Sequence, residues 1–338
     1  MSVVVLKSGL LTTLQDAGRP GHAALGVGRA GAMDLPAWQL ANALVGNTRG
    51  EAAFEFTLIG PTLRFDRAVD IALTGAVPRA EVDGHTLPGW TRCHLPAGSV
   101  LKLGGMAHGC RGYLAVGGGF DAASVLGSRS TDLHAKLGPL DGRALREGDR
   151  LDLGEHVPLS LWPSDDALHV ASWSLDPQPW FDLAPLQPER FEALPLSLAL
   201  LPGSHTTQLD APSLERLHSQ PFTISKDANR TANRLDGQIL SLRTPLELIS
   251  EAVLPGTVQL PPSGQPIVLM AEAPVTGGYP RIGQLAAADL PRLAQRRPGD
   301  AVCFHACTPE QASARLAAKR QRLDGLLATI ARRLQGGH

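Results

Sequence analysis

The pattern of apolar and polar positions predicts many short β-strands joined by tight turns. Apolar runs of strand length stand at Val69–Thr74, Ser99–Leu103, Gly112–Val116 and Arg150–Leu153. Gly-Ser or Gly-Asp pairs at 98–99, 148–149 and 299–300 stand directly before such runs. Glycine and proline are spread along the chain and are not concentrated in one linker, which is typical of an all-β barrel or sandwich.

Two helices are predicted outside this pattern. Asp34 can cap a helix that has Pro36 in its first turn and that ends at Gly46. A second helical pattern runs from Pro309 to Leu334, with leucine and isoleucine near one face and basic residues mostly elsewhere. We interpret these basic positions as a solvated face in preference to a docking surface for an acidic partner.

The Gly-Asp pairs at 148–149 and 299–300 each close a β-rich unit, near residues 153 and 304, so the chain divides into two domains of related architecture. A length of 338 residues is sufficient for two domains with well-buried cores. We predict an N-terminal β-barrel domain at 1–157, a Pro-rich connection at 158–195, a C-terminal β-barrel domain at 196–308 and a C-terminal helix at 309–338.

Composition and charge indicate a folded protein that has no net positive charge to attract polyanions. Hydrophobic residues make up 43% and charged residues 19% of the chain, and the formal net charge is −1, so we predict no nucleic-acid or membrane partner. The first residues lack the charged and apolar regions of a signal peptide, and no apolar run approaches the ~20 residues of a membrane helix. Four cysteines do not make a disulfide scaffold. We therefore expect a cytoplasmic location.

Several catalytic motifs are absent from the sequence, among them the G-x-x-x-x-G-K-[ST] phosphate loop, G-x-S-x-G and H-E-x-x-H. Cys303, His305 and Cys307 alternate, so on a strand they would share one face, where zinc could use them as ligands. No C-x-x-C pair accompanies them, and cysteine packs readily as a small apolar residue. We therefore predict no metal site.

The stretch 251–279 is the densest in candidate chemistry. Two turn signals surround the apolar runs Val258–Leu260 and Ile267–Met270, and the adjacent Gly277 and Gly278 allow a close approach of backbone to a ligand. The polar residues on these otherwise apolar strands are Gln259, Gln265, Glu272 and Thr276. The alternative is an unusually turn-rich edge of a β-domain.

Three further segments have functional potential. Thr12–Arg19 is polar and turn-forming after an apolar strand. Gly31–Asp34 leads into the first helix, whose free N–H groups can hold an anion, although we favour simple capping by Asp34. Gly127–Asp132 combines hydroxyls with Arg129 and can bind a carboxylate or phosphate, or can satisfy its own backbone as a buried turn. Asn229–Gly237 is a weaker candidate.

Five sequence segments together resemble the KipA-like family in order and spacing, over about residues 5–305. They are TTLQDAGRPG, GVGRAGAMD followed by ANALVGN, GSRST, and LPGTVQLPPSGQPIVLMAEAPVTGGYP. That family includes the C subunit of 5-oxoprolinase and allophanate hydrolase subunit 2-type proteins, and is similar to part of the carboxyltransferase region of urea carboxylase. The resemblance implies two cyclophilin-like β-barrel domains, in a mainly β fold with a few short helices and a C-terminal helix.

The resemblance also implies a hydrolase subunit that is inactive alone. Its expected partners are the KipI-like B subunit of 5-oxoprolinase and the lactam-hydrolase A subunit, and the complex opens 5-oxo-L-proline to L-glutamate with ATP hydrolysis. No recognisable motif in this chain holds ATP. One alternative is a carboxyltransferase subunit that acts on urea or a related amide, with biotin on another chain because the Ala-Met-Lys-Met attachment site is absent. Another is a KipA-like binding protein that antagonises a KipI-type kinase inhibitor.

Departures from the family pattern bear on substrate identity more than on the fold. The chain has Asp227–Arg230 where relatives commonly show Ser-Asp-Arg, Glu272 where they usually carry Asp, and Val275 where a second threonine is usual.

The hypothesis of a 5-oxoprolinase subunit assigns roles to individual residues. Glu272 or Asp34 would be the general base. Arg129 or Arg19 would hold the substrate carboxylate. The predicted substrate-binding residues are Asp16, Arg19, Arg129, Ser130, Thr131, Gln259, Gln265, Thr276, Gly277, Gly278 and Tyr279. We further expect Glu272 and Thr276–Tyr279 to face a cleft beside Asp16, Asp34 or Arg129.

Overall fold

The computed structural model describes residues 2–48, 50–155, 162–176 and 195–336, which form two compact units. The first unit takes in Met1–Arg19, Asp34–Asp182 and Leu323–His338. The second takes in Pro20–Met33 and Leu183–Arg322. Most of the predicted Pro-rich connection at 158–195 lies outside the described residues.

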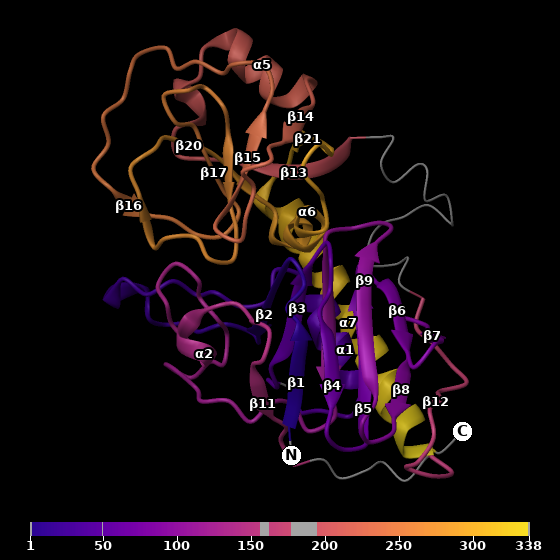
Figure 1. Ribbon diagram of the computed structural model, residues 1–338. Coiled ribbons are helices and arrows are strands. Elements are labelled where there is room, and N and C mark those ends of the chain that lie inside the picture. The colour runs from indigo at the N-terminus through magenta and orange to yellow at the C-terminus, as the bar shows by residue number, and fades with distance from the viewer. Residues whose placement is uncertain (1, 49, 156–161, 177–194, 337–338) are drawn as a thin grey trace. The chain divides into compact units, whose positions relative to one another are not determined.

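The first unit is built from two antiparallel sheets of six strands each (Figure 1). One sheet has the order β11 (Arg150–Asp152), β1 (Ser2–Lys7), β4 (Thr62–Phe65), β9 (Val100–Met106), β6 (Pro78–Val82) and β7 (His85–Leu87). The other has the order β12 (His169–Val170), β8 (Arg92–Leu95), β5 (Val69–Gly75), β10 (Arg111–Val116), β3 (Ala53–Thr57) and β2 (Leu11–Gln15). Helix α1 (Leu35–Leu44) packs on β5 and β10.

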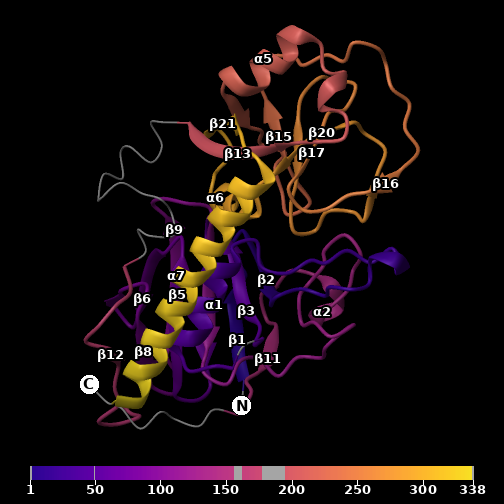
Figure 2. The same ribbon diagram turned by 180° about the vertical axis from the view of Figure 1, so that it is seen from behind.

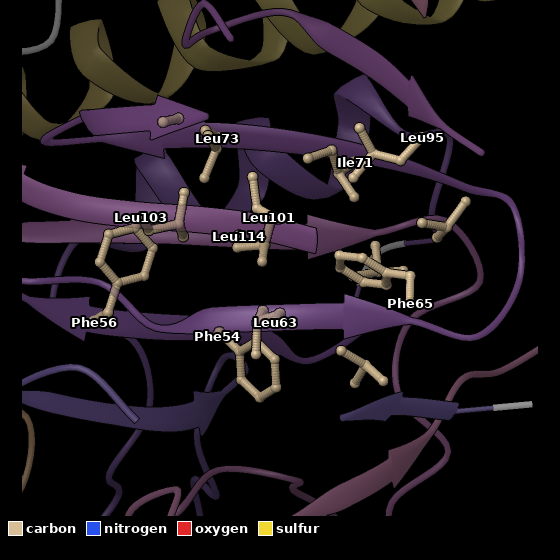
Figure 3. Close-up of a cluster of buried hydrophobic side chains, with 14 of the residues drawn as sticks. Phe54, Phe56, Leu63, Phe65, Ile71, Leu73, Leu95, Leu101, Leu103 and Leu114 are labelled. Carbon is tan, nitrogen blue, oxygen red and sulfur yellow. The ribbon is translucent and has the colours of Figure 1, made fainter. Parts of the chain in front are cut away.

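The core of the first unit combines apolar side chains from both sheets (Figure 3). Leu63 and Leu101 come from one sheet, whereas Phe54, Ile71 and Leu114 come from the other. All five are buried, and burial of such side chains is the main favourable contribution to folding, at about 1.5–3 kcal/mol for each. Buried positions alternate with less buried ones along β4 and the first half of β9, which follows from the two-residue period of a strand.

The second unit contains a closed barrel of seven strands. Their order is β13 (Leu196–Pro202), β20 (Arg281–Leu285), β17 (Thr257–Gln259), β18 (Ile267–Leu269), β15 (Ala232–Asp236), β14 (Phe222–Ile224) and β21 (Ala301–Ala306). β13 and β21 are parallel and close the barrel. A two-stranded ribbon of β16 (Glu251–Ala252) and β19 (Thr276–Gly277) is separate from it.

The remaining helical elements in the described part of the chain are short, with one exception. They are η1 (Ala23–Leu25), α2 (Pro139–Gly142), η2 (Thr206–Gln208), α5 (Ala211–Ser219), η3 (Ala287–Asp289), α6 (Leu290–Ala294) and α7 (Pro309–Gly336). Figure 2 shows α7 as one long continuous helix, as the apolar periodicity predicts. No helix in the described part of the chain is both long and apolar enough to cross a membrane.

The predicted mainly β fold with a C-terminal helix is confirmed. In detail, the strands of the first unit form two sheets, whereas those of the second form one closed barrel and a two-stranded ribbon. The two units also divide the chain differently from the predicted domains, because 20–33 groups with the second unit and α7 contributes to both. Met33 shows why, since its side chain is part of the apolar core of the barrel.

Candidate functional site

Asp16 joins two of the predicted motifs in the first unit. Its Oδ1 accepts hydrogen bonds from Gly18 N at 2.8 Å, Ser128 Oγ at 2.6 Å and Ser130 Oγ at 2.5 Å. Its Oδ2 accepts one from Arg129 N at 2.6 Å. The residue is only 6% exposed, so the four donors take the place of water around a buried carboxylate. Asp16 therefore organises the Gly127–Asp132 turn.

Arg19 and Gln15 extend this network. Arg19 is buried and donates from Nε to Val125 O at 3.4 Å and from Nη2 to Ser130 O. Gln15 donates from Nε2 to Thr131 O at 2.9 Å, whereas its buried Oε1 has no hydrogen-bond partner among the described residues. Arg19 and Gln15 therefore donate hydrogen bonds to backbone carbonyls in and beside the Gly127–Asp132 turn.

Arg129 differs from Arg19 in exposure. Its side chain is 34% exposed, its Nε donates to Ala122 O at 3.0 Å, and its Nη1 lies 3.7 Å from Glu51 Oε2. Because Asp16 holds the Arg129 backbone, the guanidinium starts from a fixed point and reaches solvent. Of the two arginines predicted to hold a substrate carboxylate, Arg129 is the accessible one.

Asp34 belongs to a second buried network in the first unit. Its Oδ1 accepts from Ala37 N at 3.1 Å, which confirms the predicted helix cap. Its backbone N–H donates to Tyr113 Oη at 2.7 Å, and that hydroxyl donates to Glu55 Oε2 at 2.7 Å. Arg111 Nη1 lies 3.5 Å from Glu55 Oε1. Burial and the charges of Glu55 and Asp34 raise the pKa of Tyr113 well above its ordinary value, so the phenol stays neutral.

Tyr113 and Glu55 were not among the residues predicted from the sequence. Both lie on strands that are buried throughout most of their length, and they face each other directly in the register of β3 and β10. The signal for Glu55 was its position between Phe54 and Phe56, since a carboxylate on a buried strand requires a partner. The identity of that partner depends on the register, which the sequence does not show.

A third buried cluster in the first unit surrounds Asp70, which was also not among the residues predicted from the sequence. Arg92 Nη2 lies 2.7 Å from Asp70 Oδ2, while His94 Nδ1 at 2.9 Å and Trp162 Nε1 at 2.8 Å contact Oδ1. His94 Nε2 lies 3.7 Å from Asp165 Oδ1. Burial alone lowers the pKa of His94, but the hydrogen bond to Asp70 and the charges of Asp70 and Asp165 outweigh it and raise the pKa above its ordinary value.

In the second unit, Glu272 forms a buried ion pair with Arg230. Arg230 Nε donates to Glu272 Oε1 at 2.5 Å, and both side chains are 2% exposed. The Glu272 backbone N–H donates to Arg230 O at 2.9 Å. Arg230 Nη2 also donates to Gly31 O at 2.7 Å. The pair lies just outside the ends of β15 and β18, which are neighbours in the barrel.

Gln259 and Gly277 form a close contact in the same unit. A Cβ on Gly277 would lie 2.4 Å from Gln259 Nε2, so any larger residue there would displace the end of the Gln259 side chain. Gln259 is 5% exposed, and its Nε2 has no hydrogen-bond partner among the described residues. Gly278 differs, because the nearest atoms to a Cβ there are 3.5 Å away. Thr276 and Tyr279 on either side are exposed.

Gln265 and the segment Cys303–Cys307 make hydrogen bonds and packing contacts that stabilise the local structure. Gln265 accepts from Gly237 N and donates to Gly237 O, both at 2.9 Å. His305 Nδ1 lies 2.9 Å from Ser197 Oγ, and Cys307 packs in a small apolar cluster. Cys303 lies beside Ser197 in the register of β21 and β13. Within the described residues, no three His, Cys, Asp or Glu side chains are placed to hold a metal ion.

The structure therefore gathers the predicted residues in separate groups. Asp16, Arg19, Arg129, Ser130 and Thr131 come together in the first unit, from segments more than 100 residues apart. Asp34 lies in the network of Tyr113 and Glu55. Glu272 pairs with Arg230, and Gln259 packs on Gly277, in the second unit. A shared cleft that joins residues of both units stays a prediction.

Comparisons with known proteins agree with the resemblance seen in the sequence. The chain is 40% identical over 310 residues to the 5-oxoprolinase C subunit of Escherichia coli (strain K12), a match that covers 91% of this chain and 92% of that protein. It is 35% identical over 301 residues to the 5-oxoprolinase C subunit of Haemophilus influenzae, with 89% and 90% covered. The crystal structure of the Kluyveromyces lactis urea carboxylase matches with a TM-score of 0.81 and 25% identity, over 97% of this chain but only 29% of that longer one. Residues 25–306 match the family described as carboxyltransferase domain, subdomain A and B, and the chain belongs to that family.

Proposed function

We propose that the chain is the C subunit of an ATP-dependent 5-oxoprolinase that opens 5-oxo-L-proline to L-glutamate together with partner subunits. The observation that carries this proposal is the 40% identity to the Escherichia coli 5-oxoprolinase C subunit, because it extends over 91% of this chain and 92% of that protein. The partners would be a KipI-like B subunit and a lactam-hydrolase A subunit.

The reaction adds water across the ring amide. The water oxygen bonds to the carbonyl carbon, the ring C–N bond breaks, and the nitrogen takes up a proton to become the amino group of glutamate. Because an amide carbonyl is a weak electrophile, its oxygen must be activated, and ATP hydrolysis in the assembled complex would supply that activation. A positioned carboxylate would take the proton from the attacking water.

The residues of this chain would bind and orient the substrate. Arg129 suits the substrate carboxylate, because its guanidinium is partly exposed on a backbone that Asp16 holds. In the second unit, taken by itself, the buried Gln259 amide is a donor suited to a carbonyl oxygen of a ligand. The unpaired Nε2 of Gln259 supports this role, since a buried donor without a partner is costly unless a ligand or water satisfies it.

Co-expression with both partner subunits tests the proposal. We expect ATP-dependent release of glutamate from 5-oxoproline only when all three chains are present, with each two-chain combination as the control. A soluble three-chain complex that releases no glutamate would overturn the proposal. Binding to the KipI-like partner without hydrolysis by any combination would point to the KipA-like binding protein instead.

A second candidate function is that of a carboxyltransferase subunit for urea or a related amide. The match to the urea carboxylase structure over 97% of this chain favours it. Biotin would arrive on another chain, and the donor of Gln259 would suit a ureido or amide carbonyl oxygen equally well. The test is urea-dependent incorporation of labelled bicarbonate with a biotin carboxylase and a biotinylated carrier, with the unbiotinylated carrier as control. Incorporation without glutamate release in the first assay would select this function.

A further inference from the structure

The turn that precedes Asp34 has a strained backbone. Ala30 has a φ of 52° and Gly31 a φ of 95°, so two consecutive residues occupy the left-handed region. For alanine this conformation costs about 1–2 kcal/mol. Ala30, Ala32 and Met33 are buried, and Met33 lies in the core of the barrel. Such a conformation persists only where the surrounding structure holds it in place.

Arg230 makes the contact that holds this turn in place. Its Nη2 donates to Gly31 O at 2.7 Å, across 199 positions of sequence, while its Nε donates to Glu272 Oε1 at 2.5 Å. A planar guanidinium presents N–H groups in fixed directions, so one side chain binds the carbonyl and the carboxylate together. Lysine keeps the charge but has a single flexible ammonium group, so it cannot reproduce both contacts with the same geometry.

Neighbouring contacts fix Arg230 itself. The Glu272 N–H donates to Arg230 O at 2.9 Å, and Met270 N donates to Thr231 O at 2.8 Å, which continues the pairing of β15 and β18. Asn229 Oδ1 accepts from Thr231 N at 2.8 Å and ties down the turn before β15. The guanidinium therefore extends from a rigid part of the barrel.

We infer that Arg230 is a positioning residue that holds the Gly31 carbonyl and thereby fixes the backbone leading into Asp34. Glu272 is then the counter-ion of Arg230 and not the general base, because its Oε1 already accepts a guanidinium N–H. The catalytic part of this inference rests on the proposed function, whereas the structural part does not.

Hydrogen exchange in the isolated full-length chain tests the structural part. We expect the peptide that contains Gly31–Met33 to exchange about 10-fold faster or more in Arg230→Gln and Arg230→Lys than in the wild type. Arg234→Gln is the matched control, because Arg234 is exposed on β15 and should leave the exchange unchanged. Unchanged exchange in both Arg230 variants would overturn the inference. If Arg230→Gln does not fold, Arg230→Lys decides.

Kinetics in the reconstituted three-chain complex tests the catalytic part. For Arg230→Lys we expect a fall in kcat of about 10-fold or more with a change in KM for 5-oxoproline of less than about 3-fold. Glu272→Gln should lower kcat in the wild-type background but add little in the Arg230→Gln background, since the two residues act as one unit. Glu272→Asp should recover part of the loss.

If Glu272 were the general base, these experiments would give a different result. In that case Glu272→Gln would lower kcat by about 10²–10⁴-fold in either background, remove the acidic limb of the pH profile and leave the exchange of Gly31–Met33 unchanged. That combination would refute the role of Glu272 as a counter-ion. A wild-type complex without any activity would count against the proposed function alone, because the exchange experiment needs no turnover.

Discussion

Replacing Asp16 with asparagine should destabilise the first unit strongly. The carboxylate accepts hydrogen bonds from Gly18 N, Ser128 Oγ and Ser130 Oγ on one oxygen and from Arg129 N on the other. In Asp16→Asn an NH₂ group, which cannot accept, takes the place of one oxygen. In either orientation of the amide, at least one buried donor loses its acceptor.

The expected loss in unfolding free energy follows from that count. A buried donor left without its acceptor costs about 1–3 kcal/mol, and the remaining bonds lose the charge of their acceptor. We therefore expect Asp16→Asn to cost about 2–4 kcal/mol and Asp16→Ala, which strands all four donors, to cost more.

Urea unfolding followed by tryptophan fluorescence measures this loss. Of the five tryptophans, the four at described positions, 38, 90, 162 and 173, all belong to the first unit, so their signal reports on that unit, and position 180 lies outside the described residues. The midpoint shift multiplied by the slope of the transition gives the change in free energy. Asp121→Asn is the matched control, because Asp121 is exposed and its substitution should change stability by less than about 0.5 kcal/mol. If Asp16→Asn shifts the midpoint no more than this control, the carboxylate does not hold the two motifs together.

Two further predictions concern His94 and Gly277. Because Asp70 holds the pKa of His94 above its unfolded value of about 6.5, the stabilising effect of His94 should be complete below that pH and lost as pH rises through the folded pKa. Urea unfolding of wild type and His94→Gln across this range should show a difference that shrinks with rising pH, and a constant difference would contradict the reasoning. Gly277→Ala places a Cβ 2.4 Å from Gln259 Nε2 and should cost about 1 kcal/mol, at the low end for overpacking, because the end of the Gln259 side chain can shift. Gly325→Ala on α7 meets nothing within 4 Å and should be neutral or stabilising, so equal calorimetric Tm values for these two variants would refute the steric argument.

Local sequence patterns determined the secondary structure well, because they involve residues a few positions apart. The predicted runs at 69–74 and 112–116 correspond to β5 and β10, and the cap at Asp34 begins α1 as expected. The glycines of the predicted turn pairs, Gly98, Gly148 and Gly299, have φ values of 84°, 87° and 94°, which only glycine adopts readily. Each of these features depends on the conformational preference of a single short segment.

Candidate residues could also be found from sequence, but their partners could not. Asp16 and Ser130 both stand in motifs that the sequence singled out, yet 114 positions separate them, and only the folded sheets bring them into contact. Glu272 was one of two carboxylates predicted as the general base, from its residue type and its place in the stretch 251–279. Its contact with Arg230 depends on the pairing of β15 with β18, which a linear pattern does not specify.

The sequence by itself determined the fold class, the family and most of the segments that carry polar chemistry. Only the tertiary structure decided that 20–33 belongs with the barrel, that Glu55 meets Tyr113, and that Arg230 reaches Gly31. The physical reason is the same in each case. Turns and caps arise from local backbone and side-chain geometry, whereas buried polar groups must be paired, and their partners depend on strand register and chain topology.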